Sequence, residues 1–138
     1  MTAKIRTVEY FYTTVEDKPG EAYALLAKLA SAEINLLAFS AVPMGPRHTQ
    51  LTIFPETAED LERAAAKFEL NLIGPQHALL IQGDDQLGAL TGIHRKLFDA
   101  DINVYASTGV TDGSGRYGYL IYVKDEDFPA AAEVLAGV

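Results

Sequence analysis

The sequence of 138 residues contains no cysteine. A disulfide framework, a thiolate zinc site, an iron–sulfur cluster and a cysteine nucleophile are therefore excluded. Long hydrophobic runs are also missing, since no stretch approaches the roughly 18 to 20 apolar residues that a membrane-spanning helix needs. The first six residues lead straight into a strand-like pattern and lack the apolar segment of a signal peptide. These absences predict a cytoplasmic protein with no membrane partner.

Positive charge is scarce as well. The chain carries 11 Lys and Arg against 19 Asp and Glu, and its formal net charge is −8. An acidic chain without a Lys/Arg cluster repels phosphate backbones, so we expect no nucleic-acid partner. The three histidines, His48, His77 and His94, fit no metal-ligand spacing, and no Gly-rich phosphate loop or nucleophilic triad is found. The sequence therefore predicts no metal site, no cofactor and no enzyme activity.

The most informative feature that is present is an internal repeat of about 68 residues. With Gly20 aligned to Gly88, the first halves of the two copies match without gaps. The matched pairs are Asp17 and Asp85, Leu25 and Ile93, Leu29 and Leu97, Ile34 and Ile102, Asn35 and Asn103, and Val42 and Val110. Identity is low, but matched positions have the same physical character.

Each copy has the pattern strand, helix, strand, strand, helix. The expected strands cover residues 7–15, 34–38 and 49–54 in the first copy, and 77–82, 102–106 and 117–124 in the second. Apolar residues recur at helical spacing between and after them, at Leu25, Leu26, Leu29, Leu61 and Ala64 and again at Leu90, Ile93, Leu97, Ala131 and Leu135. We thus predict an α+β fold of two tandem units.

The pair Gly74-Pro75 is the expected boundary between the units. Leu70 to Ile73 is a plausible fourth strand of the first unit, which then spans residues 1–74. The second unit, residues 75–138, ends after its second helix, so its last strand is missing or supplied from elsewhere. An open sheet edge has unpaired backbone N–H and C=O groups that tend to pair with another strand. We therefore expect a homodimer through sheet or helix faces.

The loop Glu16-Asp17-Lys18-Pro19-Gly20 is the best candidate for a binding site. It precedes the first helix, whose free N–H groups attract anions such as a carboxylate. Asp17 beside it would take an ammonium group, so one loop offers both poles that a zwitterion needs. The alternative is structural, with Asp17 as an ordinary N-cap and Gly20 as a tight turn.

The run Asp17-Lys18-Pro19-Gly20-Glu21, followed by Leu25, Leu26, Leu29 and Ala32-Glu33-Ile34-Asn35-Leu36, resembles the opening of an ACT domain. The resemblance covers nearly the whole chain in two copies. It implies two tandem ferredoxin-like βαββαβ units with antiparallel sheets and helices on one face. By position it implies ligand contacts at Asp17, Lys18, Pro19, Gly20 and Asn35, and at Asp85, Gly88 and Asn103 in the second copy.

The second loop departs from the pattern, because Gln86-Leu87 replaces Lys18-Pro19. The first loop is therefore the expected ligand site, and a second functional pocket is in doubt. Asn35 and Asn103 also have a structural interpretation, that of capping the turn between helix and strand. An aromatic stripe either lines a pocket or forms an exposed sheet face that pairs with another subunit, and we favour the second interpretation. Its members are Tyr117, Tyr119 and Tyr122, with Tyr10, Phe11 and Tyr12.

The resemblance implies a non-catalytic regulatory protein that binds a free amino acid. Binding would change the state of a homodimer or the association with an enzyme that the protein regulates. Two other classes stay open. Duplicated β-α-β units also build metal-dependent lyases and dioxygenases, which would use His and Glu ligands on strands. A regulatory subunit that binds a partner protein without any ligand is the third hypothesis.

Overall fold

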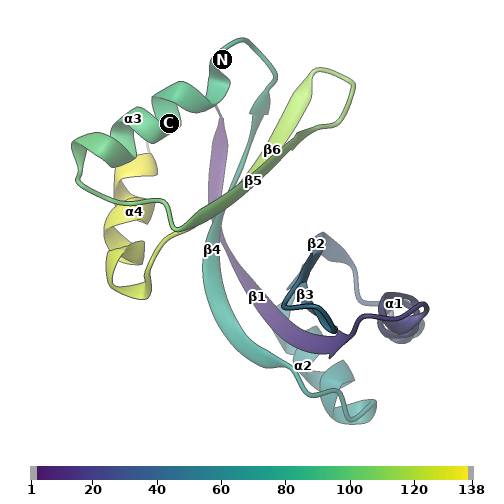
Figure 1. Ribbon diagram of the computed structural model, residues 1–138. Helices are drawn as coiled ribbons and strands as arrows, with labels where there is room; N and C mark the ends of the chain where they lie inside the picture. Colours follow the sequence, from purple (N-terminus) through teal and green to yellow (C-terminus); the bar gives the residue numbers. More distant parts are fainter. Residues whose placement is uncertain (1–2, 137–138) are drawn as a thin grey trace. The chain divides into compact units, whose positions relative to one another are not determined.

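The computed structural model describes residues 3–136 (Figure 1). The described elements are β1 (Lys4–Glu16), α1 (Glu21–Ser31), β2 (Leu36–Pro43), β3 (His48–Pro55), α2 (Ala58–Lys67), β4 (Ile73–Asp84), α3 (Ala89–Asp99), β5 (Ala106–Thr111), β6 (Arg116–Tyr122), the 3₁₀ turn η1 (Asp125–Asp127) and α4 (Phe128–Leu135). None of these helices has the length and apolar character needed to cross a membrane.

The chain forms two compact units. The inner unit is Glu9–Gln76, and the outer unit combines the chain up to Val8 with the chain from His77 onward. In the inner unit the strand order is β2-β3-β1-β4, and in the outer unit it is β5-β6-β4-β1. The pairs β1 with β3, β2 with β3, β4 with β6 and β5 with β6 are antiparallel. Each unit therefore has the same ferredoxin-like topology, and the predicted ACT-like α+β fold is confirmed.

The units do not divide at the predicted boundary. Gly74 and Pro75 lie inside β4, which belongs to the inner unit up to Gln76 and to the outer unit afterwards. Gly74 has φ +145°, and a Cβ there would lie 2.8 Å from the Tyr10 carbonyl oxygen. Glycine thus lets the strand continue close to β1 where the sequence indicates a break. Leu70 and Leu72 pack on the inner core but precede the strand.

The fourth strand of the outer unit comes from the start of the chain. Lys4 to Val8 is the first part of β1, which lies next to β4 in the strand order. Ala3 and Ile5 pack against the outer core. The expected strand over residues 7–15 is thus in reality a strand of 13 residues, of which the two units use different parts.

Each unit has its own hydrophobic core between two helices and one sheet face. The inner core joins Phe11, Leu51 and Ile53 of the strands to helix residues Leu25, Leu29 and Leu61. The outer core is built in the same way from Leu79, Ile81, Ile93, Leu97, Ile102, Tyr119, Ile121, Val123, Ala131 and Leu135. Figure 1 shows α3 and α4 together on one side of the outer strands. Each fully buried Leu or Ile contributes about 1.5–3 kcal/mol to folding.

The repeat of the sequence recurs in the backbone. Ile34 N–H donates to Leu29 O at 3.0 Å, and Ile102 N–H donates to Leu97 O at 2.9 Å. The same offset relates the left-handed residues Glu33 (φ 60°) and Asp101 (φ 59°). It also relates the hydrogen bonds from Met44 N to His48 O and from Asp112 N to Arg116 O. The two units therefore share turns as well as topology.

Candidate functional site

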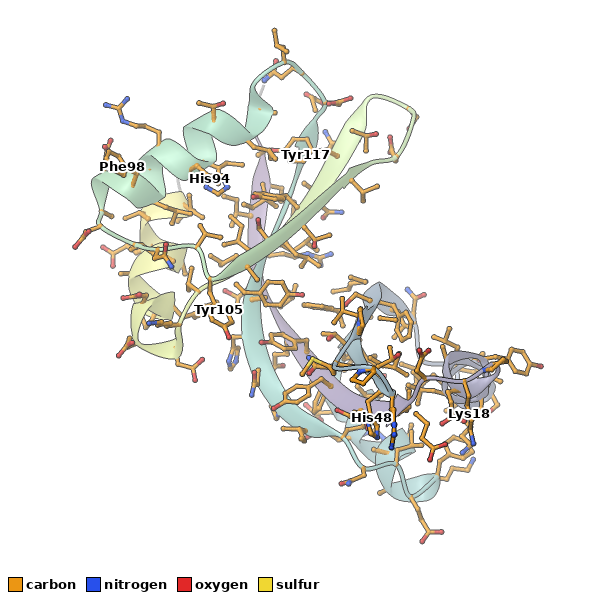
Figure 2. The ribbon with its side chains drawn as sticks, viewed as in Figure 1. Lys18, His48, His94, Phe98, Tyr105 and Tyr117 are labelled. Atoms are coloured by element: carbon orange, nitrogen blue, oxygen red, sulfur yellow. The ribbon has the colours of Figure 1, made fainter. Side chains whose placement is uncertain are left out.

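A pocket of about 430 Å³ lies in the inner unit where β1 passes into α1. We call it the Asp17 pocket. Residues of the loop and of the first turn of α1 form one side, and the strands β2 and β3 form the other. Its walls are Val15, Glu16, Asp17, Lys18, Glu21, Ala22, Ala41, Pro43, Thr49 and Leu51. Figure 2 shows Lys18 at the beginning of α1.

A second pocket, of about 480 Å³, lies in the outer unit where β4 passes into α3. We call it the Asp85 pocket. Its walls are Asp85, Gln86, Gly88, Ala89, Leu90, Thr91, Gly109, Val110, Thr111, Tyr117 and Gly118. Figure 2 shows Tyr117 on β6, near the loop that leads to α3. A functional pocket at the second loop was in doubt from the sequence, and the structure contains a cavity there whose volume is similar to that of the Asp17 pocket.

The two pockets are equivalent position by position. Seven wall residues of one correspond to seven of the other at the offset of the repeat. The pairs are Asp17 and Asp85, Lys18 and Gln86, Glu21 and Ala89, Ala22 and Leu90, Ala41 and Gly109, Pro43 and Thr111, and Thr49 and Tyr117. Since β2–β3 and β5–β6 are hairpins of the same register, the same alternate positions face both pockets.

The loops that form the pockets are held by equivalent backbone contacts. Asp17 N–H donates to Arg47 O at 2.8 Å, and Asp85 N–H donates to Gly115 O at 2.8 Å. The N-cap residues of α1 and α3 are Gly20 (φ 93°) and Gly88 (φ 74°), and neither cap has a side-chain hydrogen bond. The alternative that Asp17 is an ordinary N-cap is therefore wrong. A tight turn at Gly20 is confirmed, because its left-handed conformation favours glycine.

The free amides at the two helix starts differ. Within residues 3–136, the N–H groups of Glu21, Ala22 and Tyr23 in α1 have no hydrogen-bond acceptor. In α3, Ala89 N–H donates to Gln86 O at 3.0 Å and Thr91 N–H donates to Gly88 O at 3.0 Å. Free N–H groups at a helix start form an anion site. The start of α1 is thus the better hydrogen-bond donor to a carboxylate.

The Asp17 pocket is rich in charge. It contains the carboxylates of Glu16, Asp17 and Glu21 and the ammonium group of Lys18. Lys18 Nζ lies 3.2 Å from Glu16 Oε2. This hydrogen bond and the negative charges of Glu16 and Glu21 raise the pKa of Lys18. Lys18 is hydrogen-bonded to Glu16 and also attracts Glu21, so one ammonium group stands against three carboxylates and the pocket keeps negative charge for a ligand.

The Asp85 pocket is polar but nearly uncharged. Among its wall residues only Asp85 carries a charge, and Thr91, Thr111 and Tyr117 contribute hydroxyl groups. Burial raises the pKa of the Tyr117 hydroxyl, partly offset by the charge of Arg116. The phenol therefore stays protonated near neutral pH and is able to donate or accept a hydrogen bond.

The structure brings only some of the predicted site residues together. Asp17 and Lys18 line one pocket, and Asp85 and Gly88 line the other, whereas Pro19 and Gly20 shape the first loop without lining it. Asn35 precedes β2 at the end opposite to the pocket residue Pro43. Its Nδ2 donates to Glu56 Oε2 at 3.1 Å, and Glu56 N–H donates to its carbonyl at 2.9 Å.

Asn103 is exposed and likewise does not line the pocket of its unit. The structural interpretation of Asn35 is thus supported by its bonds to Glu56, which join β2 to the end of β3. The strand walls Ala41, Thr49 and Gly109 were not predicted from the sequence, whereas Tyr117 was considered as a pocket residue. The repeat offset applied to alternate hairpin positions is the signal that would have found them.

Acidic residues outside the two pockets have structural roles. Asp84 Oδ1 accepts a hydrogen bond from Arg116 Nη1 at 2.8 Å and is thus an ion-pair partner across β4 and β6. Asp125 to Asp127 form the turn η1 before α4. Within residues 3–136 no three His, Asp or Glu side chains gather as ligands for a metal ion.

The favoured interpretation, an exposed sheet face, is wrong for Tyr117 and Tyr119. Tyr119 is buried in the outer core, where its hydroxyl lies 2.7 Å from His94 Nε2. Tyr117 lines the Asp85 pocket, in line with the other interpretation.

Comparison with known proteins gives similarity at the level of structure. No family model matches the sequence, and no curated protein matches it. Protein BT0572 from Bacteroides thetaiotaomicron has a similar structure with a TM-score of 0.81 and 16% identity, over 96% of this chain and 89% of that one. The ligand-free regulatory subunit of aspartate kinase from Thermus thermophilus gives a TM-score of 0.65 with 13% identity, over 98% and 95% of the two chains.

The regulatory subunit of aspartate kinase from Thermus flavus is similar too, with a TM-score of 0.60, 14% identity and coverage of 99% of this chain and 96% of that one. All three identities are low, so the likeness extends to the fold alone. The arrangement of strands and helices in this chain is therefore one that the regulatory subunits of aspartate kinase also adopt.

Proposed function

We propose that this chain is a non-catalytic regulatory protein of two ACT-type units that binds a small zwitterion, most simply a free amino acid, at the loop between a strand and a helix. The observation that carries the proposal is the duplicated pocket. Two cavities of similar volume have equivalent walls, and each has an aspartate beside the start of a helix. Two of the similar structures bear the name of a regulatory subunit of aspartate kinase, which supports the regulatory part.

The chemistry of the Asp17 pocket suits both ends of an amino acid. The free N–H groups of Glu21, Ala22 and Tyr23 would hold the carboxylate at the positive end of α1. The Asp17 carboxylate would take the α-ammonium group, as a charge-assisted hydrogen bond. A dissociation constant of about 1 mM requires only about −4 kcal/mol, which a few such contacts supply. A ligand-binding role for each of the predicted residues stays a prediction, and Pro19, Gly20, Asn35 and Asn103 line neither pocket.

A thermal-shift panel of the common amino acids tests this function. A ligand at about 100 times its dissociation constant should stabilise the chain by about 2.7 kcal/mol, which raises Tm by several degrees. Asp17→Ala and Asp85→Ala each remove one carboxylate from one pocket. Because neither side chain caps a helix, we expect both variants to keep the Tm of the unliganded protein.

Glu62→Ala is the matched control, since Glu62 is an exposed acid on α2 outside both pockets and its loss changes the net charge equally. The proposal expects a ligand shift that Glu62→Ala keeps and that one or both aspartate variants lose. The proposal is overturned if no amino acid shifts Tm, or if Asp17→Ala and Asp85→Ala each keep the full ligand-induced shift.

A homodimer is part of the proposed function, and an enzyme regulated by the ligand-bound state is its proposed further partner. The edge strand β5 supports the dimer. It ends the strand order, all six of its residues are exposed, and none is charged. An uncharged open edge is a template for pairing with another strand. In sedimentation equilibrium we expect a dimer that Ser107→Lys on β5 weakens, and a monomeric wild type would contradict this part.

A further inference from the structure

The two pockets share one backbone frame but differ in charge. The first residue of the helix is Glu21 in α1 and Ala89 in α3. Glu16 lines the Asp17 pocket, whereas its equivalent Asp84 is paired with Arg116 and does not line the other pocket. The formal charge of the wall residues is thus more negative in the Asp17 pocket than in the Asp85 pocket.

We infer that the two pockets select ligands by net charge. The Asp17 pocket takes a small amino compound of net positive charge, the Asp85 pocket takes a zwitterion of no net charge, and the residue that opens the helix, Glu21 or Ala89, is the specificity-determining position. This inference rests on the proposed function, because it assigns a ligand class to each of the same two pockets.

The contacts available in the Asp17 pocket explain the selection. The free amides of α1 and the Asp17 carboxylate satisfy one carboxylate and one ammonium group of the ligand. Glu21 is the remaining carboxylate, because Lys18 is hydrogen-bonded to Glu16 at 3.2 Å and attracts Glu21 without a hydrogen bond, so one ammonium group faces two further acids. A ligand with a second cationic group would place it against the Glu21 carboxylate. A ligand without a second cationic group would leave this carboxylate beside it without a counter-charge from the ligand. Charges at the edge of a partly enclosed pocket interact more strongly than in bulk water.

The Asp85 pocket offers no partner for a second cation. Its one charged wall residue is Asp85, which the α-ammonium group of the ligand would use. The hydroxyls of Thr91, Thr111 and Tyr117 and the amide of Gln86 are left, and these are hydrogen-bonding groups without charge. A neutral polar side chain suits them, and a guanidinium or second ammonium group would lose its hydration without gaining a counter-charge.

The test uses L-arginine and L-citrulline, which have nearly the same shape and differ by one positive charge. In amide NMR spectra of the whole chain, the signals of Ala22 and Tyr23 report on one pocket and those of Gly88 and Leu90 on the other. We expect arginine to bind the Asp17 pocket at least tenfold more tightly than citrulline. We expect citrulline to bind the Asp85 pocket at least as tightly as arginine.

Two charge exchanges isolate the helix-opening position. Glu21→Gln keeps the shape of the side chain and should reduce the preference of the Asp17 pocket for arginine at least tenfold. Ala89→Glu should create a preference for arginine in the Asp85 pocket, and Ala89→Gln, of the same size without charge, should not. An acidic residue in a first turn favours the helix, so we expect Ala89→Glu to fold. In the wild type, the preference of the Asp17 pocket for arginine should also decrease at high salt concentration, because salt screens the charge of Glu21.

The outcomes separate the inference from the function on which it rests. If neither probe nor any other amino acid moves the signals of either pocket, the proposed function is overturned. If the signals move but arginine and citrulline bind each pocket equally, or if Glu21→Gln leaves the preference unchanged, the function stands and the charge selection is overturned.

Discussion

The Nε2 atom of His94 on α3 lies 2.7 Å from the hydroxyl oxygen of Tyr119 on β6. The tyrosine ring is buried in the outer core, and the other buried side chains of this core are aliphatic. A buried hydroxyl needs a hydrogen-bond partner, and the histidine satisfies it. The contact thus ties a helix to the sheet at the point where the core is otherwise apolar.

Tyr119→Phe should destabilise the chain by about 0.5–1.5 kcal/mol, because it removes this hydrogen bond and leaves the packing of the ring intact. Urea unfolding followed by circular dichroism measures the change. Tyr23→Phe is the control, since Tyr23 is 76% exposed on α1 and should change nothing measurable. Equal effects of the two substitutions would show that the contact with His94 contributes no stability.

Gly74→Ala should destabilise the chain by about 1–3 kcal/mol. Its φ of +145° is costly for any residue with a Cβ, and that atom would lie 2.8 Å from the Tyr10 carbonyl oxygen. Gly92→Ala is the matched control, because Gly92 lies within α3 and its Cβ would meet nothing within 4 Å. There we expect a gain of about 0.5–1 kcal/mol from helix propensity. Urea midpoints of the two variants on opposite sides of the wild type would confirm both expectations.

Leu29→Ala and Leu97→Ala should each cost about 2–5 kcal/mol, since both side chains are fully buried at equivalent positions of the two cores. Leu87→Ala should stay within about 0.5 kcal/mol of the wild type because Leu87 is fully exposed. Hydrogen exchange of amides in each unit would show which core each variant loosens. A cost below about 1 kcal/mol at either buried leucine would contradict the assignment of that core.

Asp112 should make stability depend on pH in the acid range. The backbone N–H groups of Ser114 and Arg116 donate to its Oδ1 at 2.7 and 3.2 Å and lower the pKa of its carboxyl group. A pKa that is lower in the folded state stabilises the fold above the unfolded pKa of about 3.9, and this contribution is lost as the pH falls through the folded value. Asp112→Ala should therefore be less stable than the wild type at pH 7, with a difference that shrinks below about pH 4.

Urea unfolding at a series of pH values checks this expectation, and a difference that grows toward acid pH would show the opposite sign of linkage. The NMR titration of Asp112 gives the direction of its pKa independently of any variant.

Local patterns of the sequence predicted the parts of the fold that depend on local physics. Leu25, Leu29, Ile93 and Leu97 follow helical spacing, and all are buried on the expected helix faces. The repeat also predicted equivalent turns, which recur in the hydrogen bonds. The turn before α1 was predicted because a glycine precedes the helix, and Gly20 has the left-handed conformation that favours glycine.

The features that were missed depend on contacts between distant parts of the chain. Gly74-Pro75 usually ends a strand, and only the close approach to Tyr10 shows why it does not do so here. The strand walls of the pockets come from hairpins that are remote in sequence from the loops. The buried position of Tyr119 follows from the register of β6 against β4 and β5, which a single strand does not reveal.

The outer unit uses the beginning of β1 as its fourth strand, and its remaining elements follow after Gln76. During synthesis the inner unit has all of its residues once the chain has passed Gln76. The residues from Lys4 to Val8 are translated before the inner unit, yet most of their partner strand β4 and the helices α3 and α4 are translated after it. The inner unit is thus able to fold before the outer unit is complete, because the outer unit also needs the residues that follow Gln76.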